Sequence, residues 1–349
     1  MTSWLEIPEI GIGTMMWGTT PLDRKINGQI AGDESLLQIR ARATQLGILF
    51  IDTAEGYGGG SCEKRIGDNR FPAFGYTVAT KFLPTIWRWS ERAVPRAIRA
   101  SNVRLGIERC PLCFIHTPVH FRSPDVWIRG GARAIREGVL ERLGVSNFDA
   151  EELRRACRIA REEGIGVAAN QILFSLLTYG SASVREIVAA CRELDVALIG
   201  YGVLGQGLLT DGLTRDKAAR SRYSRIASVG YEDLVPLRRE IGRIAHRRDC
   251  DMAQVCIAWA LQKNTTVLVG MRSAEHLEKS AAAREIALTE EELRTLDELA
   301  LDRATFRRAR SRRLVFVVLI SLLIIGYRIS RIIPELPAGG ANHEERKCR

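Results

Sequence analysis

Four side chains with acid–base chemistry stand at or just after the ends of short apolar runs. Asp52, Lys81 and His116 close three such runs, and Tyr57 lies in the loop behind the first. A tyrosine with a pKa of about 10 is a poor acid at neutral pH. A neighbouring lysine ammonium lowers that pKa, while a carboxylate keeps the lysine charged and oriented. An imidazole can donate a hydrogen bond to an oxygen that gains negative charge. Together these groups could protonate a carbonyl oxygen after its carbon has received a hydride.

Each of these residues also has an ordinary structural explanation when it is taken alone. A lysine or aspartate at a strand end is often a solvated charge, and a histidine after an apolar run is often a hydrogen-bonded core residue. The catalytic interpretation therefore depends on whether the fold brings the four positions together.

The elements that must do this are apolar runs that alternate with longer amphipathic segments. With a first strand at residues 10–14, these runs give eight strand–helix units, which predicts a closed (β/α)8 TIM barrel or a doubly wound sheet. The runs lie at residues 47–52, 76–81, 112–116, 140–145, 167–170, 196–201 and 265–269. Gly11-Ile12-Gly13 lacks the third glycine of a dinucleotide-binding turn, so the barrel is favoured. In such a barrel functional side chains come from the carboxyl ends of the strands.

Composition and charge restrict the class of protein. The chain has 349 residues, 46% hydrophobic and 26% charged, which is typical of a globular protein with a sizeable core. Its net charge is +10, but residues 303–349 hold 11 basic and 3 acidic residues, so the first 302 carry 40 basic against 38 acidic ones. We therefore expect no nucleic-acid-binding face on the main body.

The eight cysteines are scattered and do not form a dense disulfide framework. Cys110 and Cys113 make a single CxxC, and because no second CxxC accompanies it, buried thiols are favoured over a metal or redox site. We expect no bound metal and a reducing compartment.

The C-terminal region differs from the rest. We divide the chain into a barrel domain over residues 1–302, an Arg-rich linker over 303–313, a hydrophobic helix over 314–333 and a polar tail over 334–349. The uncharged part of that helix is short for a membrane span, which needs about 20 residues, but snorkelling of Arg328 and Arg331 would extend it. A buried helix that caps the barrel is the alternative. We favour a tail anchor that leaves the barrel on the cytosolic side, and a cytoplasmic protein otherwise.

Several co-linear motifs resemble those of the aldo-keto reductases. The most specific is FIDTAEGYG at residues 50–58, with Glu63 and Gly67 behind it. The other matching segments are residues 78–81, 115–116, 144–148, 170–171, 201–209 and 269–273. The resemblance covers residues 8 to 300 and implies a (β/α)8 barrel that binds NADPH and reduces an aldehyde or ketone to the alcohol. It implies that Tyr57 is the proton donor, that Lys81 and Asp52 tune it, and that His116 orients the carbonyl.

The resemblance also implies the cofactor site, taken along the cofactor from one end to the other. Ser146, Asn147 and Gln171 would hold the nicotinamide carboxamide, and Tyr201 would stack on the ring. The pyrophosphate would lie along Leu204, Gly205, Gln206 and Leu208. The 2′-phosphate and adenine would be held by Gly270, Arg272, Ser273, His276 and Ser280. The guanidinium of Arg272 suits NADPH better than NADH.

Within the family, the pattern around Phe82, Trp87 and Arg88 resembles a plastid-type branch that includes pyridoxal reductases, which makes pyridoxal a candidate substrate and a plastid an alternative location. We expect Trp17, Phe82 and Trp87 to form an aromatic substrate pocket with Tyr57, although packing at the barrel rim would equally explain Trp17 and Trp87. Two other functions stay open: a non-catalytic NADPH-sensing regulatory subunit on a membrane, and a membrane-associated structural protein.

Overall fold

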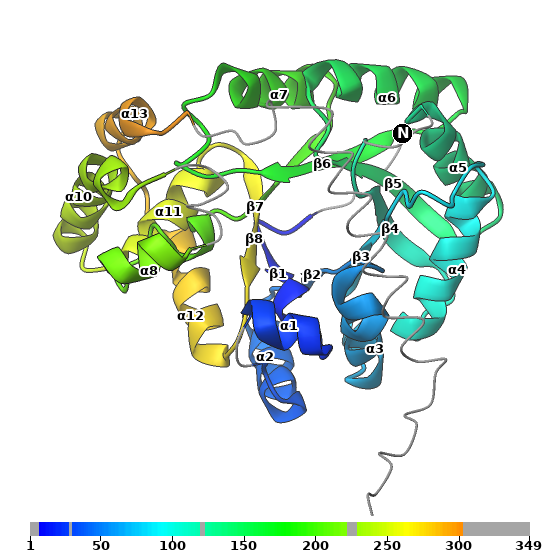
Figure 1. The fold of residues 1–349 in the computed structure, drawn as a ribbon, viewed down its shortest axis with the longest axis horizontal. Coiled ribbons are helices and arrows are strands. Elements are labelled where there is room, and N and C mark those ends of the chain that lie inside the picture. The colour runs from blue at the N-terminus through cyan, green and yellow to red at the C-terminus, as the bar shows by residue number, and fades with distance from the viewer. Residues whose placement is uncertain (1–6, 28–29, 119–122, 222–228, 303–349) are drawn as a thin grey trace, which may run out of the picture.

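Eight parallel strands close into a barrel in which each strand pairs with the next and β8 returns to β1 (Figure 1). The computed structural model describes residues 7–27, 30–118, 123–221 and 229–302. The strands are β1 (Ile10–Gly13), β2 (Phe50–Asp52), β3 (Thr77–Phe82), β4 (Cys110–Ile115), β5 (Leu140–Ser146), β6 (Val167–Leu173), β7 (Ala197–Tyr201) and β8 (Thr265–Gly270). The prediction of a TIM barrel is confirmed, and the doubly wound alternative is wrong.

Helices form a ring around the strands (Figure 1). The α-helices are α1 (Pro21–Asn27), α2 (Asp33–Gln45), α3 (Ser61–Asp68), α4 (Ala93–Leu105), α5 (Asp125–Arg136), α6 (Ala150–Glu162), α7 (Ala182–Glu193), α8 (Arg215–Arg220), α10 (Tyr231–Arg247), α11 (Met252–Leu261), α12 (Ala274–Ala282) and α13 (Glu290–Leu299). Short 3-10 turns lie at η1 (Met15–Trp17), η2 (Tyr57–Gly60), η3 (Pro72–Phe74), η4 (Gly205–Gly207) and η5 (Ala283–Glu285).

The buried side chains form two layers. A large cluster packs between strands and helices, and a smaller one fills the barrel interior with residues from the strands, including Phe50 and Phe114. Glycines on neighbouring strands make room for these two rings. A Cβ on Gly11 would lie 2.5 Å from Phe50 Cδ1, and one on Gly144 would lie 2.6 Å from Phe114 Cδ1. The interior is therefore a close-packed plug beneath the carboxyl ends of the strands.

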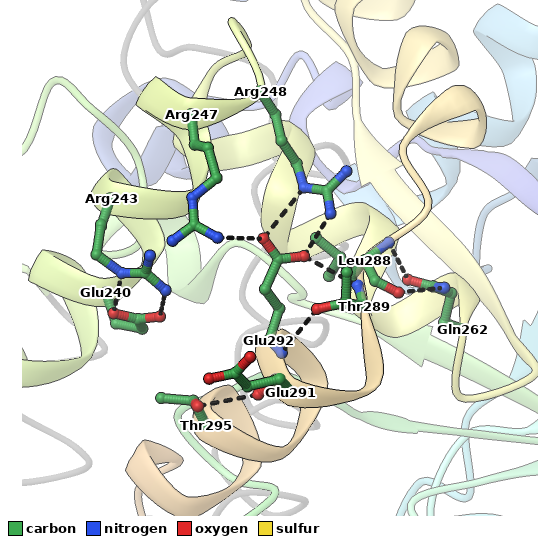
Figure 2. Close-up of polar contacts among 10 residues, drawn as sticks. All are labelled: Glu240, Arg243, Arg247, Arg248, Gln262, Leu288, Thr289, Glu291, Glu292 and Thr295. Atoms are coloured by element: carbon green, nitrogen blue, oxygen red, sulfur yellow. Dashed lines mark hydrogen bonds and ion pairs between the residues drawn. The ribbon is translucent and has the colours of Figure 1, made fainter.

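The last helix of the described residues, α13, is held to α10 by ion pairs. Glu292 of α13, almost fully buried, accepts hydrogen bonds from Arg248 and lies 3.7 Å from Arg247 at the end of α10 (Figure 2). Thr289 and Glu292 also form a capping box that satisfies the first backbone N–H groups of α13.

The predicted Arg-rich linker, hydrophobic helix and polar tail, over residues 303–349, lie outside the described part of the chain. Within the described ranges, every helix is too short or too polar to cross a membrane.

Candidate active site

The carboxyl ends of β2 and β3 hold a buried ion pair. Lys81 Nζ lies 2.5 Å from Asp52 Oδ2 and also donates to the Thr53 carbonyl at 2.8 Å. Strand register explains the meeting, because Asp52 lies opposite Ala79, two residues before Lys81. Burial raises the pKa of Asp52 and lowers the pKa of Lys81, and the attraction between the two charges opposes both shifts.

Tyr57 begins the 3-10 turn η2, in the loop directly behind Asp52. Its ring is half-buried, and its centroid lies 5.0 Å from Lys81 Nζ. Three glycines follow it within the turn, and all three have left-handed backbone angles, with φ of 56°, 59° and 96°. These angles let the chain fold back sharply after the tyrosine, so that the loop stays at the barrel rim.

The expectation that Lys81 lowers the pKa of Tyr57 is wrong for this structure. Burial raises the Tyr57 pKa well above its ordinary value, and the charge of Asp52 raises it further. These two effects outweigh the attraction that the Lys81 ammonium, 5.0 Å from the ring centroid, would exert on a phenolate. Tyr57 therefore holds its proton firmly across the neutral range.

His116 follows β4 and presents its half-buried ring edge-on to Tyr57, with 5.8 Å between ring centroids. Burial, and then the positive charge of Lys81, lower its pKa to about 3. The imidazole is therefore neutral at physiological pH. Within the described residues, its Nδ1 is buried without a hydrogen-bond partner. The backbone is fixed by bonds from His116 N to the Phe82 carbonyl and from Asn147 Nδ2 to the His116 carbonyl.

Beside this group, β5, β6 and β7 bring together the four residues predicted to hold a nicotinamide. Tyr201 Oη donates to Asn147 Oδ1 at 2.8 Å, and Asn147 Nδ2 donates to Ser146 Oγ at 3.1 Å. Ser146 Oγ in turn donates to the Gln171 carbonyl at 3.0 Å. This set of hydroxyl and amide groups around a half-buried aromatic ring fits a planar cofactor ring that bears an amide.

Gln171 also contacts the ion pair, which the sequence did not reveal. Its side-chain Nε2 donates to Asp52 Oδ1 at 2.8 Å, and both side chains are buried. Gln171 therefore connects the predicted cofactor residues to the Asp52–Lys81 pair.

The loop after β7 contains the predicted pyrophosphate residues. Leu204 precedes η4, Gly205 and Gln206 lie in it, and Leu208 follows it. Gln206 has a left-handed φ of 56°, and an exposed side chain. Leu208 is buried. Its N–H donates to the Gly205 carbonyl at 3.3 Å, and its carbonyl accepts from Arg238 of α10 at 2.8 Å. The arrangement is a glycine-rich turn tied to a helix.

The remaining predicted cofactor residues lie at the end of β8 and on α12. Gly270 and Arg272 are exposed just before the helix, and Ser273 Oγ caps it by accepting from His276 N. Ser280 is buried and its hydroxyl donates to the His276 carbonyl at 2.8 Å. A guanidinium at a helix N-terminus suits a phosphate group, whereas Ser280 has its hydroxyl committed within the helix.

Two of the three residues predicted to line the substrate pocket are in the core instead. Trp17 is fully buried against Phe71, and its Nε1 donates to the Met271 carbonyl. Phe82 is also buried, 5.4 Å from the ring of Trp127. Trp87 is 39% exposed, which agrees with a place at the rim. The sequence shows which residues are aromatic but not which way their side chains point, so it did not reveal that Trp17 and Phe82 turn into the core.

A hollow of about 490 Å³ lies elsewhere, beside α13, and Tyr179, Lys263 and Asp297 contribute to its lining. None of the four acid–base residues borders it, so it does not change the placement of the candidate site. Among the described residues, no cluster of metal-binding side chains is present.

Comparison with known proteins places this geometry in a family. The model of the "Aldo/keto reductase family" matches residues 9–301. "Pyridoxal reductase, chloroplastic" of Arabidopsis thaliana is 30% identical over an alignment of 303 residues that covers 82% of this chain and 82% of its own. "Methylglyoxal reductase YeaE" of Escherichia coli is 24% identical and covers 84% of this chain and 91% of its own. A solved aldo/keto reductase from Klebsiella pneumoniae, in complex with NADP and acetate, is 25% identical with a TM-score of 0.66, over 87% of this chain and 94% of its own.

Proposed function

The chain belongs to the aldo/keto reductase family, and from this premise we propose that it reduces an aldehyde or ketone with NADPH, with Tyr57 as the proton donor. The observation that carries the proposal is the meeting of Tyr57, His116 and the buried Asp52–Lys81 pair at one end of the barrel. NADPH supplies the hydride when it is bound.

The residues of this chain would handle the proton and the developing charge. The raised pKa keeps Tyr57 protonated until the carbonyl oxygen becomes basic. The neutral His116 can donate one N–H bond to that oxygen and so orient it. After Tyr57 has given up its proton, Lys81 is close enough to stabilise the phenolate, while Asp52 holds the lysine in place.

We assign the cofactor to the residues that the sequence predicted. Ser146, Asn147, Gln171 and Tyr201 supply hydroxyl, amide and aromatic groups for the nicotinamide end, and the exposed Arg272 beside the capped helix supplies a cation for a phosphate. The Klebsiella pneumoniae relative in complex with NADP supports the same cofactor class.

The names of two relatives indicate the substrate class. The Arabidopsis relative is named for pyridoxal and the Escherichia coli relative for methylglyoxal, so we propose a small carbonyl compound, with pyridoxal as the first candidate.

The test is NADPH oxidation by the full chain against pyridoxal, methylglyoxal, benzaldehyde and an aldose. We expect repeated turnover, and we expect Tyr57→Phe to reduce kcat at least about a hundredfold while the Kd for NADPH stays close to wild type. Full turnover by Tyr57→Phe would remove Tyr57 from its assigned role. NADPH binding with only stoichiometric hydride release would instead support the sensing subunit.

We also propose, from the sequence of residues 314–333 alone, that the enzyme is attached to a membrane by its C-terminal region. Removal of residues 303–349 should then move the protein from the membrane fraction to the supernatant with its activity unchanged. Continued sedimentation of the truncated protein would contradict this attachment.

A further inference from the structure

We propose that an ion pair between Glu55 and Arg88 is a positioning device that sets substrate selectivity, because it fixes an aromatic loop at the barrel rim relative to the proton donor. The inference rests on the proposed function. The aromatic loop is defined as residues 83–92, between β3 and α4. It contains Trp87 and Trp89, which are 39% and 52% exposed.

The two partners come from loops that follow neighbouring strands. Glu55 lies two residues before Tyr57, and Arg88 lies in the aromatic loop. The contact is bidentate: Arg88 Nη1 is 2.5 Å from Glu55 Oε1, and Arg88 Nη2 is 2.9 Å from Glu55 Oε2. Such a fork fixes direction as well as distance. It therefore restricts how the aromatic loop can rotate against the Tyr57 loop.

Further bonds tie the same pair to the backbone on both sides. Glu55 Oε1 also accepts from Leu83 N at 2.6 Å, and Arg88 Nη1 donates to the Leu83 carbonyl at 2.7 Å. Glu55 N donates to the Lys81 carbonyl at 3.3 Å. We call these bonds of Glu55 and Arg88 the clamp. It extends from the end of β3, which carries Lys81, to the middle of the aromatic loop.

Burial makes this pair stiffer than an ordinary surface contact. The side chains of Glu55 and Arg88 are only 14% and 18% exposed. The Arg88 guanidinium lies 4.5 Å from the centroid of Phe82, which itself packs on Trp127 in the core. Arg88 therefore packs on a residue of β3, and water competes weakly for its hydrogen bonds.

The rim position gives the clamp a consequence for substrates. Trp87 and Trp89 flank Arg88, whose bonds to Glu55 hold this part of the aromatic loop next to the loop that carries Tyr57. Exposed aromatic side chains in such a place are suited to contact a flat, apolar part of a ligand. Their contribution depends on a fixed distance from Tyr57, and the clamp is the connection that sets this distance. A small carbonyl compound that reaches only Tyr57 and His116 would gain nothing from it.

The experiment compares pyridoxal and benzaldehyde with methylglyoxal as substrates of the full-length protein. We expect Arg88→Met to lower kcat/KM for the two aromatic aldehydes on the order of tenfold or more, mainly through KM, while methylglyoxal changes little. Arg88→Lys should lose less kcat/KM for the aromatic aldehydes than Arg88→Met, because lysine keeps the positive charge but cannot form the bidentate contact. The matched control is Arg155→Met, which breaks a bidentate pair with Asp125 on the outer helices α5 and α6.

Hydrogen exchange provides a readout that does not need activity. In Arg88→Met, amides of residues 83–92 should exchange faster while those around Arg155 do not, and the control should show the reverse. If Arg88→Met fails to fold, Glu55→Gln takes its place, because glutamine can still accept from Leu83 N but has no charge. Unchanged exchange, or an unchanged ratio of aromatic to small substrate, overturns the positioning role. If the wild-type protein turns over none of the substrates, but Arg88→Met still changes hydrogen exchange in residues 83–92, only the proposed function is overturned.

Discussion

The buried Asp52–Lys81 pair and the outer belt of ion pairs use the same kinds of groups at similar distances. The outer belt is the set of pairs that join α4, α5, α6 and α7 on the outside of the barrel: Arg99–Glu137, Arg136–Glu163, Arg155–Asp125 and Arg154–Glu193. Lys81 and Asp52 are 2.5 Å apart with side chains 1% and 5% exposed, whereas Arg154 and Glu193 are 2.6 Å apart with side chains 47% and 54% exposed.

Burial, and not distance, separates the two kinds of pair. Water and salt screen the outer belt, and its long side chains lose conformational freedom when they pair. At the carboxyl end of the barrel, the charges of the Asp52–Lys81 pair act on Tyr57 and His116: Asp52 raises the pKa of Tyr57, and Lys81 lowers the pKa of His116. We therefore expect mutations in the two regions to differ strongly in effect.

The largest effect should follow from Lys81→Met. The substitution leaves the buried Asp52 without its cation, which should cost about 3–5 kcal/mol of unfolding free energy and most of the turnover. Urea denaturation and NADPH oxidation would measure the two losses. The double variant Lys81→Met with Asp52→Leu should regain stability, because no buried charge is left, but should stay inactive. A double variant as unstable as Lys81→Met alone would contradict this account.

A second effect concerns pH and His116. Its folded pKa is about 3, whereas an unfolded histidine takes up a proton near pH 6.5. Between these values the unfolded chain binds more protons, so acidification lowers the unfolding free energy, by at most about 1.4 kcal/mol per pH unit. His116→Gln removes this contribution, and its stability should fall less steeply than that of the wild type in denaturant titrations from about pH 7 to about pH 5. Equal slopes would show that the imidazole is not buried in its neutral form.

A smaller effect should follow from Gln171→Leu, which removes the amide that donates to Asp52. A hydrogen bond to a charged group contributes about 1.5–3 kcal/mol. In a double-mutant cycle with Asp52→Asn, the two substitutions should cost less together than the sum of their separate costs, because Asp52→Asn removes the charge of the acceptor and Gln171→Leu removes the donor of the same charge-assisted hydrogen bond. Ser146→Ala is the control, because the Ser146 hydroxyl bonds the Gln171 carbonyl and the Asn147 amide but not Asp52. Strict additivity of Gln171→Leu and Asp52→Asn would disprove the coupling.

The smallest effect should follow from Arg154→Met in the outer belt. We expect a thermal midpoint within experimental error of the wild type and unchanged turnover, because both partners are well exposed. Any difference seen at low salt should disappear at about 1 M salt, where screening is strong, while the loss in Lys81→Met should persist. A midpoint drop in Arg154→Met comparable to that of Lys81→Met would break the comparison between the two regions.

These two regions were not equally visible in the sequence. Asp52, Lys81 and His116 could be found because each ends an apolar run, and parallel strands of a barrel must finish at the same edge. The runs also predicted the barrel itself, since hydrophobic periodicity is a local property of the chain.

The features that could not be predicted depend on the direction in which side chains point and on contacts between residues that are far apart in the sequence. The burial of Trp17 and Phe82 depends on which way each side chain leaves the backbone. The bond between Gln171 and Asp52 joins residues 119 positions apart, and no local pattern marks it. The raised pKa of Tyr57 required knowledge of how deeply the phenol is buried and of how close it lies to the Asp52 charge. In each case the three-dimensional surroundings of the side chain decide the outcome.

The two aromatic rings inside the barrel have a consequence for how this protein can change over generations. Gly144 cannot gain a methyl group while Phe114 fills the adjacent space, and the same holds for Gly11 and Phe50. The order of substitutions therefore matters: a smaller residue at position 114 must come first, and alanine at position 144 can follow. Related barrels should show glycine and phenylalanine at these paired positions exchanged together, so that the interior preserves its total volume while its individual residues vary.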